Sequence, residues 1–142
     1  GLVISQVLKK LNRNVNLYCL RRNFYKGDAK KAYKKNKLVK NSFNKLVIYR
    51  NSIIVDCLFG IGLNRKINGI YKKIIKKVNK SKQYIISIDI PSGINGNTGE
   101  KMGEAIKANL TYALHAKKDG HTIGMGKKYS GKVKVVDIGI KE

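Results

Sequence analysis

The chain has 142 residues and a formal net charge of +23, and 42% of its residues are hydrophobic. A chain of this length buries about 68–70% of its unfolded surface in one domain without a disulfide or a metal, and this hydrophobic content argues against a chain kept disordered by its charge. The sequence holds no apolar run of about 18 residues and no signal-like segment, so we do not expect a membrane-spanning protein.

The first half of the chain is predicted to combine helices with short strands. Apolar residues recur at helical spacing in residues 1–11, and residues 15–20 are predicted to form a strand. Residues 28–40 are predicted to form a helix that an aspartate opens. Residues 46–49 and 52–59 are rich in β-branched residues, and the second run is typical of a strand buried on both faces.

The second half continues this alternation. The spacing predicts an amphipathic helix over residues 71–78 and a strand over residues 84–90. Residues 102–108 are predicted to make one helical turn, and residues 110–116 and 131–140 to form strands. Strands that alternate with helices imply an α/β fold with a mostly parallel sheet and helices on both faces.

Ligands of such open sheets bind beyond the carboxyl ends of the strands. Three segments with suitable chemistry follow predicted strands, and they are Asp56–Lys66, Asp89–Gly99 and Ala116–Gly126. We therefore expect the functional site where these three segments meet.

The stretch "IDIPSGINGNTGE", residues 88–100, contains the only proline of the chain. Pro91 cannot continue an interior ladder, so it ends the strand directly after Asp89. Two interpretations stay open for Asp89, which can cap a tight turn or act as a general acid or base. Ser92 offers a hydroxyl that can cap the turn or coordinate a hard cation.

Asp56 lies inside the apolar run of residues 52–59. A carboxylate there costs free energy unless it is paired. A monovalent cation held by Asp56, the Ser92 hydroxyl and main-chain carbonyls would compensate this cost, and so would a salt bridge to a lysine. The sequence leaves both open.

The motif "GIGLNRK", residues 60–66, follows one predicted strand and precedes a predicted helix. Its backbone N–H groups, together with Arg65 and Lys66, are able to cradle a phosphate. It has neither the GxGxxG spacing nor the GK[ST] ending of a P-loop, so an ordinary loop is the alternative.

The third segment gives the weakest signal. His115 and His121 have no third ligand in reach, so we do not predict a metal site there. Lys117 and Lys118 are candidates for phosphate contacts, with solvated lysines as the alternative. Residues 124–132 are predicted to form a glycine-bearing loop that approaches a ligand.

The positive charge comes from 26 lysines and only 5 arginines. Arginine recognises phosphates and bases better, so the excess favours a solvated lysine surface produced by A/T-rich codons. A polyanion such as RNA remains the competing partner. Cys19 and Cys57 form no CxxC pair and are predicted to be structural thiols in a reducing, cytoplasmic environment.

The motifs in this order resemble the NAD(P)H-hydrate epimerase family, the YjeF N-terminal domain. The matching stretches are "VDCLFGIGLNRKINGIY" (55–71), "IISIDIPSGINGNTGE" (85–100), "MGEAIKANLTYALHAKKDGH" (102–121) and "GKVKVVDIGI" (131–140). The helix of residues 1–11 also resembles the one that follows the family's Asn-Asn-Gly-Gly-Asp loop. We therefore expect residues 1–142 to be a single domain of this type that lacks its N-terminal portion.

The resemblance implies a Rossmann-like three-layer α/β/α sandwich that binds a potassium ion and forms a homodimer. It implies an isomerase that interconverts the R and S epimers of hydrated NADH and NADPH in metabolite repair. Such enzymes work with, or are fused to, an ATP- or ADP-dependent NAD(P)H-hydrate dehydratase. The alternative function is a non-catalytic module that binds a nucleotide or a polyanion, and nucleic acid is the less favoured partner.

By motif position, the resemblance assigns Asp56 and Ser92 as potassium ligands and Asp89 as the catalytic acid or base. It implies substrate contacts from Gly60, Ile61, Gly62, Leu63, Asn64, Arg65, Lys66, Asp89 and Lys118.

Overall fold

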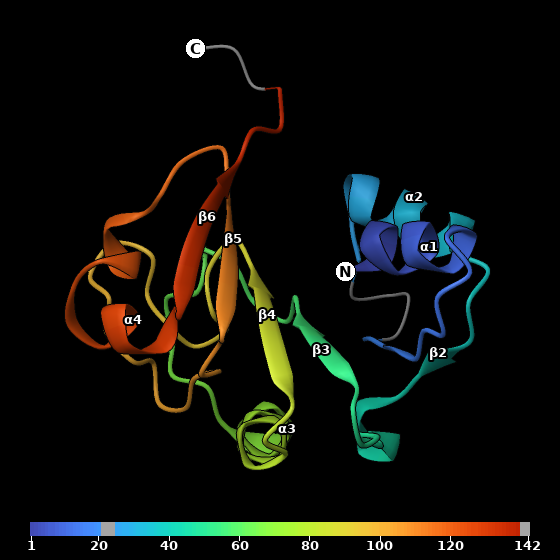
Figure 1. Ribbon diagram of the computed structural model, residues 1–142, viewed down its shortest axis with the longest axis horizontal. Coiled ribbons are helices and arrows are strands. Elements are labelled where there is room, and N and C mark those ends of the chain that lie inside the picture. Colours follow the sequence, from blue (N-terminus) through green and yellow to red (C-terminus); the bar gives the residue numbers. More distant parts are fainter. Residues whose placement is uncertain (21–24, 140–142) are drawn as a thin grey trace. The chain divides into compact units, whose positions relative to one another are not determined.

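The computed structural model describes residues 1–20 and 25–139. The chain forms two compact units, Gly1–Val47 and Ile48–Glu142, which are described separately below. Both combine helices with parallel strand pairs (Figure 1). No helix of the described residues is long and apolar enough to cross a lipid bilayer.

The first unit contains two helices and a two-stranded parallel sheet. Its elements are α1 (Leu2–Lys10), β1 (Leu17–Tyr18), α2 (Gly27–Lys35), β2 (Lys40–Asn41) and the short 3₁₀ helix η2 (Phe43–Lys45). The Asn36 side-chain amide, after α2, donates to the Leu2 carbonyl over 2.7 Å and to the Ser5 hydroxyl over 2.9 Å. This buried polar contact ties α2 to α1.

The two predicted helices and the first predicted strand of this unit occur, but each is shorter than predicted. The predicted strand of residues 15–20 is reduced to β1, and the predicted helix of residues 28–40 ends at Lys35. Residues 46–49 form no strand, because their backbone makes no ladder. β2 was not predicted, since neither of its residues is apolar.

The second unit is a four-stranded parallel sheet with helical connections. Its elements are β3 (Ile53–Asp56), α3 (Gly69–Lys80), β4 (Tyr84–Ile88), β5 (Leu110–Leu114), the 3₁₀ helix η3 (Asp119–His121), α4 (Gly124–Tyr129) and β6 (Lys132–Val136). The strand order is β3-β4-β5-β6, all parallel. The expected α/β class with a mostly parallel sheet, as in a Rossmann-like three-layer arrangement, is confirmed (Figure 1).

One face of this sheet is buried in β4 and β5. Ile85, Ser87, Thr111 and Ala113 alternate along β4 and β5 and are all buried. On α3, the buried residues are three of the four predicted for its apolar face, namely Ile74, Ile75 and Val78. A second buried cluster lies in the chain after β4, where Ile90, Ile94 and Ala105 pack together and Met125 and Tyr129 pack against them.

The other face of the sheet is partly exposed. Ile53 and Val55 of β3 and Tyr84 of β4 are 63%, 37% and 48% exposed. The prediction that residues 52–59 form a strand buried on both faces is therefore wrong for the described structure. Period-2 burial appears instead, with Asp56 on the buried side.

Residues 102–108 form no helix, so the prediction of a helical turn is wrong. The Met102 and Ile106 N–H groups donate to the Gly93 and Ser92 carbonyls over 2.7 and 2.8 Å, so this segment pairs with the chain after β4 rather than with itself. Residues 124–129 form α4, where the sequence predicted a loop.

Gly93 makes this pairing possible. Its φ is +99°, and a Cβ at this position would lie 2.1 Å from the Glu104 carbonyl oxygen. Only glycine combines this backbone conformation with so close a neighbour. The buried Pro91 precedes it, so the chain leaves the sheet edge along one defined path.

Candidate active site

Two carboxylates lie at the ends of neighbouring strands. Asp56 is the last residue of β3, Asp89 directly follows β4, and these strands pair in parallel. The Leu58 N–H donates to Asp56, and Asp89 Oδ2 lies 3.9 Å from the position of a Cβ at Gly60. Both side chains therefore border the same short segment, residues 58–60, at the edge where open α/β sheets bind ligands.

Asp56 is 5% exposed and accepts four hydrogen bonds. Its Oδ1 accepts from the Ser92 hydroxyl (2.6 Å) and the Leu58 N–H (3.2 Å), and its Oδ2 accepts from the Ser92 N–H (2.8 Å) and the Ser87 hydroxyl (2.9 Å). Burial raises the pKa of the Asp56 carboxyl, and the bonds from Ser92, Ser87 and Leu58 act in the opposite direction.

These four donors use about the full acceptor capacity of a carboxylate. Among the described residues, no lysine or arginine pairs with Asp56, so the salt-bridge alternative does not occur there. Uncharged donors compensate the buried group, and the folded structure does not require a cation for this purpose.

The oxygen atoms around Asp56 nevertheless fit a hard cation. The Ser92 hydroxyl lies 2.6 Å from Asp56 Oδ1 and 3.3 Å from the Phe59 carbonyl oxygen. Carboxylate, hydroxyl and carbonyl oxygens are the donors that hard cations take in proteins. The described residues hold no group of three or more His, Cys, Asp or Glu side chains, so a site for a softer metal is not formed there.

Asp89 forms the second centre of the site. Its N–H donates to the Tyr112 carbonyl over 2.7 Å, and its φ is +71°, in the left-handed region that non-glycine residues rarely adopt. The Lys118 ammonium pairs with Oδ1, which also accepts from the Leu114 N–H over 3.4 Å. Both of these contacts are to Oδ1, and Oδ2 is the oxygen that faces Gly60.

Lys118 connects the third predicted segment to Asp89. Its ammonium donates to Asp89 and, over 2.8 Å, to the Leu114 carbonyl. The side chains of Lys118 and Asp89 are 20% and 18% exposed, so the pair is largely shielded but reachable from solvent. A third ammonium hydrogen remains for a ligand, because Lys carries three donors.

Two further residues complete the site, and the sequence did not identify their roles. Ser87 is paired in register with Asp56 and contacts its carboxylate. A serine inside an otherwise apolar strand was the available signal. His121 contacts the backbone of both Asp89 and Lys118, and no spacing in the sequence indicates this.

The loop of residues 60–66 leads away from Asp89. A turn closes at its start, where the Leu63 N–H donates to the Gly60 carbonyl over 3.2 Å. At its far end Lys66 precedes Ile67, whose N–H donates to the Met102 carbonyl over 2.8 Å. The predicted loop between strand and helix is confirmed, while its predicted substrate contacts stay a prediction.

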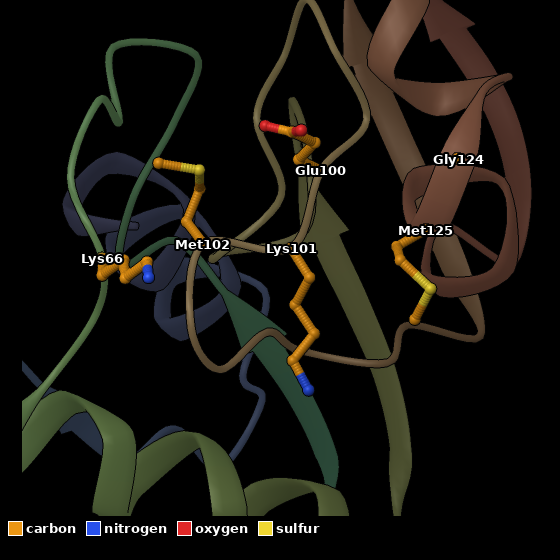
Figure 2. Close-up of a pocket in the computed structure, with 6 residues that line it drawn as sticks. All are labelled: Lys66, Glu100, Lys101, Met102, Gly124 and Met125. Carbon is orange, nitrogen blue, oxygen red and sulfur yellow. The ribbon is translucent and has the colours of Figure 1, made fainter.

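A pocket of about 540 Å³ lies at this far end (Figure 2). It is lined by Lys66, Glu100, Lys101, Met102, Gly124 and Met125. Lys66 is the predicted substrate residue that reaches it. The ammonium of Lys101 is occupied by Glu104 at 3.3 Å, which leaves Lys66 and Glu100 as the unpaired charges that the pocket presents among its described lining.

Comparison with known proteins agrees with this geometry. The chain is an α/β protein whose parallel strands bring two carboxylates and a glycine loop to one sheet edge. It belongs to the family described as YjeF-related protein N-terminus, whose model matches residues 1–120. The predicted family is confirmed.

Three curated relatives illustrate the match. The chain is 42% identical over 85 residues to an NAD(P)H-hydrate epimerase of Limosilactobacillus fermentum, covering 60% of the chain and 41% of that protein. It is 32% identical over 149 residues to an NAD(P)H-hydrate epimerase of Levilactobacillus brevis, covering 99% of the chain and 66% of that protein. It is 32% identical over 146 residues to a bifunctional NAD(P)H-hydrate repair enzyme Nnr of Coxiella burnetii, and this match covers 100% of the chain and 30% of that protein. The matched region is thus less than half of the first of these relatives.

Proposed function

We propose that the protein containing this chain interconverts the R and S epimers of hydrated NADH and NADPH. The observation that carries the proposal is the Asp89–Lys118 pair at the sheet edge, in a family whose curated relatives are named NAD(P)H-hydrate epimerase. Residues 1–120, which match the family model, include the whole first compact unit and continue into the second. This supports the interpretation of residues 1–142 as one domain of the family.

Asp89 is the proposed acid and base. Epimerisation requires that a ring carbon lose its hydroxyl and regain it on the other face. As a carboxylic acid, Asp89 protonates the leaving hydroxyl, the C–O bond breaks and water forms. As a carboxylate, it accepts a proton when water adds to the opposite face, so atoms and charges balance over the cycle. Oδ2 suits this role because Lys118 and Leu114 engage the other oxygen.

The loop of residues 60–66 is the proposed contact surface for the dinucleotide. It begins beside Asp89 and ends at the pocket of Figure 2. Its exposed backbone, together with Arg65 and Lys66, suits a phosphate. Pockets of about 300–1,000 Å³ commonly hold ligands of this class, and the volume next to Lys66 falls within that range.

Asp56 and Ser92 are the proposed potassium ligands, with the Phe59 carbonyl as a third oxygen. A potassium ion held by these residues would supply positive charge near the start of the loop that is proposed to contact the dinucleotide. We further propose that the protein works with an ATP- or ADP-dependent NAD(P)H-hydrate dehydratase, which is supported by relatives named bifunctional repair enzymes. We also propose that it is a homodimer. Its proposed location is the cytoplasm, where its free cysteines stay reduced.

The variant Asp89→Asn tests the central assignment. Interconversion of the purified R and S epimers is followed by chromatography on the full-length protein. Loss of an acid–base group lowers the rate by about 10²–10⁴-fold, and the amide retains the size of the side chain. Asp119→Asn is the matched control, because Asp119 is exposed and directly follows Lys118, in the segment after β5. A rate like that of the unmodified protein for Asp89→Asn would refute the role of this residue.

A further inference from the structure

We infer that His121 is a positioning residue that fixes Asp89 and Lys118 relative to each other, an inference that rests on the proposed role of Asp89. His121 is 3% exposed. Its Nδ1 accepts the Lys118 N–H over 2.9 Å, and its Nε2 lies 2.7 Å from the Asp89 carbonyl oxygen. One imidazole therefore bridges the backbones of both members of the ion pair.

These partners define the protonation state of the ring. A backbone N–H only donates, so Nδ1 carries no hydrogen, and a carbonyl oxygen only accepts, so Nε2 carries one. His121 is therefore the neutral Nε2–H tautomer, assigned from its bonding partners. In a doubly protonated ring, the hydrogen on Nδ1 would face the hydrogen of the Lys118 N–H. The other tautomer would have the same conflict at Nδ1 and would also leave no hydrogen between Nε2 and the Asp89 carbonyl.

The ion pair needs this second connection. Its side chains are about one-fifth exposed, and water competes with ion pairs that it can reach. The His121 bridge is buried and joins backbone atoms, which do not change rotamer. It also bonds the peptide that follows Asp89, whose left-handed backbone persists only where the surroundings fix it.

Lys118 is also positioned by the backbone of His121. It precedes η3, and the His121 N–H donates back to the Lys118 carbonyl over 3.0 Å. Lys118 is thus held at its N–H, its carbonyl and its ammonium. A displacement of about 1 Å at a catalytic group can lower a rate about 10²-fold, so we expect the bridge to influence the rate more than the affinity.

Three variants of the full-length protein test this role. His121→Phe fills the space but leaves the Lys118 N–H and the Asp89 carbonyl without the bridge, and we expect kcat to fall at least tenfold with KM within about threefold. His121→Gln places an amide donor near the Nε2 position, so most of kcat should return. Thr122→Val removes the bond of the Thr122 hydroxyl to the Asp119 carbonyl (2.9 Å) in the same turn and should leave kcat unchanged.

Substrate-independent measurements separate this inference from the proposed function. The ¹⁵N resonances of the imidazole should report the neutral Nε2–H tautomer, and exchange of the Lys118 amide should accelerate in His121→Phe. Both remain measurable if the unmodified protein fails to interconvert the epimers. An Nδ1–H tautomer, an unchanged kcat in His121→Phe, or equal losses in the Phe and Gln variants would each overturn the role of His121.

Discussion

The substitution Asp56→Asn tests how the buried carboxylate is stabilised. Asparagine has one acceptor oxygen, whereas the two oxygens of Asp56 accept from Ser87, from Leu58 and twice from Ser92. Serine hydroxyls can turn their hydrogens away. The backbone N–H groups of Leu58 and Ser92 cannot, so whichever side the amide nitrogen occupies, one backbone donor faces another donor.

The magnitude follows from which donor is left. The bond from the Ser92 N–H is buried, whereas the bond from the Leu58 N–H is only partly buried. The amide nitrogen should therefore turn toward Leu58. An unpaired buried donor costs about 1–3 kcal/mol, and bonds to a neutral acceptor are weaker than those to a charged one by roughly 1 kcal/mol. Partial exposure at Leu58 selects the lower part of this range, so the expected loss is about 2 kcal/mol at pH 7.

Native-state hydrogen exchange of the β4 and β5 amides is the suitable assay, because the chain contains two compact units and these amides report the unit that carries the site. A loss of about 2 kcal/mol accelerates their exchange roughly 30-fold. Asp137→Asn is the control, since Asp137 is exposed and bonds only the Gly139 N–H at 2.8 Å among described residues, and surface changes stay within about 0.5 kcal/mol. Unchanged exchange in Asp56→Asn would refute the reasoning.

The effect of Asp56→Asn on stability should depend on pH. Burial raises the pKa of Asp56, so the folded state holds the proton more tightly than the unfolded state does. The stability advantage of the unmodified protein over Asp56→Asn is then largest below the unfolded pKa of about 4 and decreases as pH rises through the folded pKa, so the loss of about 2 kcal/mol expected at pH 7 is the part that remains. Urea unfolding of both proteins at several pH values measures this difference. An advantage that grows with pH would mean that the four hydrogen bonds outweigh burial.

Two further predictions concern Gly93 and the proposed potassium site. Gly93→Ala should destabilise the second unit by more than about 3 kcal/mol in the same exchange assay, because its φ is +99° and the new Cβ would lie 2.1 Å from the Glu104 carbonyl oxygen. Gly62→Ala is the control, because a Cβ there meets nothing within 4 Å, and it should cost less than about 0.5 kcal/mol. Equal effects of the two substitutions would contradict the packing argument. Replacing sodium by potassium at constant ionic strength should stabilise the full-length protein by about 1.4 kcal/mol at ten times the dissociation constant and should leave Ser92→Ala unaffected; a thermal-unfolding midpoint that responds equally in both proteins would exclude Ser92 as a ligand.

Patterns with a local cause were predictable. The helix at residues 71–78 follows from apolar residues at a period of 3.6, and α3 buries Ile74, Ile75 and Val78 as this period requires. The end of β4 near Asp89 follows from Pro91, which cannot continue a ladder. In these cases the residues that determine the structure are neighbours in the chain.

Structure with a non-local cause was not predictable. α4 contains Gly124 and Gly126, which disfavour a helix. Gly126 is nevertheless needed there, because a Cβ at this position would lie 1.6 Å from the Gly120 carbonyl oxygen. Residues 102–108 likewise have a helix-like sequence, but their N–H groups bond the chain at Ser92 and Gly93. Tertiary contacts override local propensity in both segments.

The candidate site also has features that the sequence predicted and features that it did not. The strand-end rule predicted that Asp56, Asp89 and the segment after β5 would lie at one edge, because parallel strands place their carboxyl ends together. The pairing of Asp89 with Lys118, 29 positions later, depends on how the loop after β5 folds back. The His121 bridge depends on the same fold of the loop, and neither has a signature in residue spacing.

Backbone conformation gives an independent reason to regard this edge as functional. Asp89 and His115 follow the ends of β4 and β5, and both adopt positive φ, at +71° and +67°. A non-glycine residue in this region costs of order 1 kcal/mol or more and persists only where its surroundings fix it. Glycine at either position would remove the cost without altering the sheet. Position 89 instead carries an aspartate, whose side chain pairs with Lys118. The strained conformation therefore occurs at a residue whose side chain makes a contact that glycine could not make. The proposed catalytic role would account for a carboxylate in this conformation, and the bond that the same side chain accepts from the Leu114 N–H also joins the end of β4 to β5.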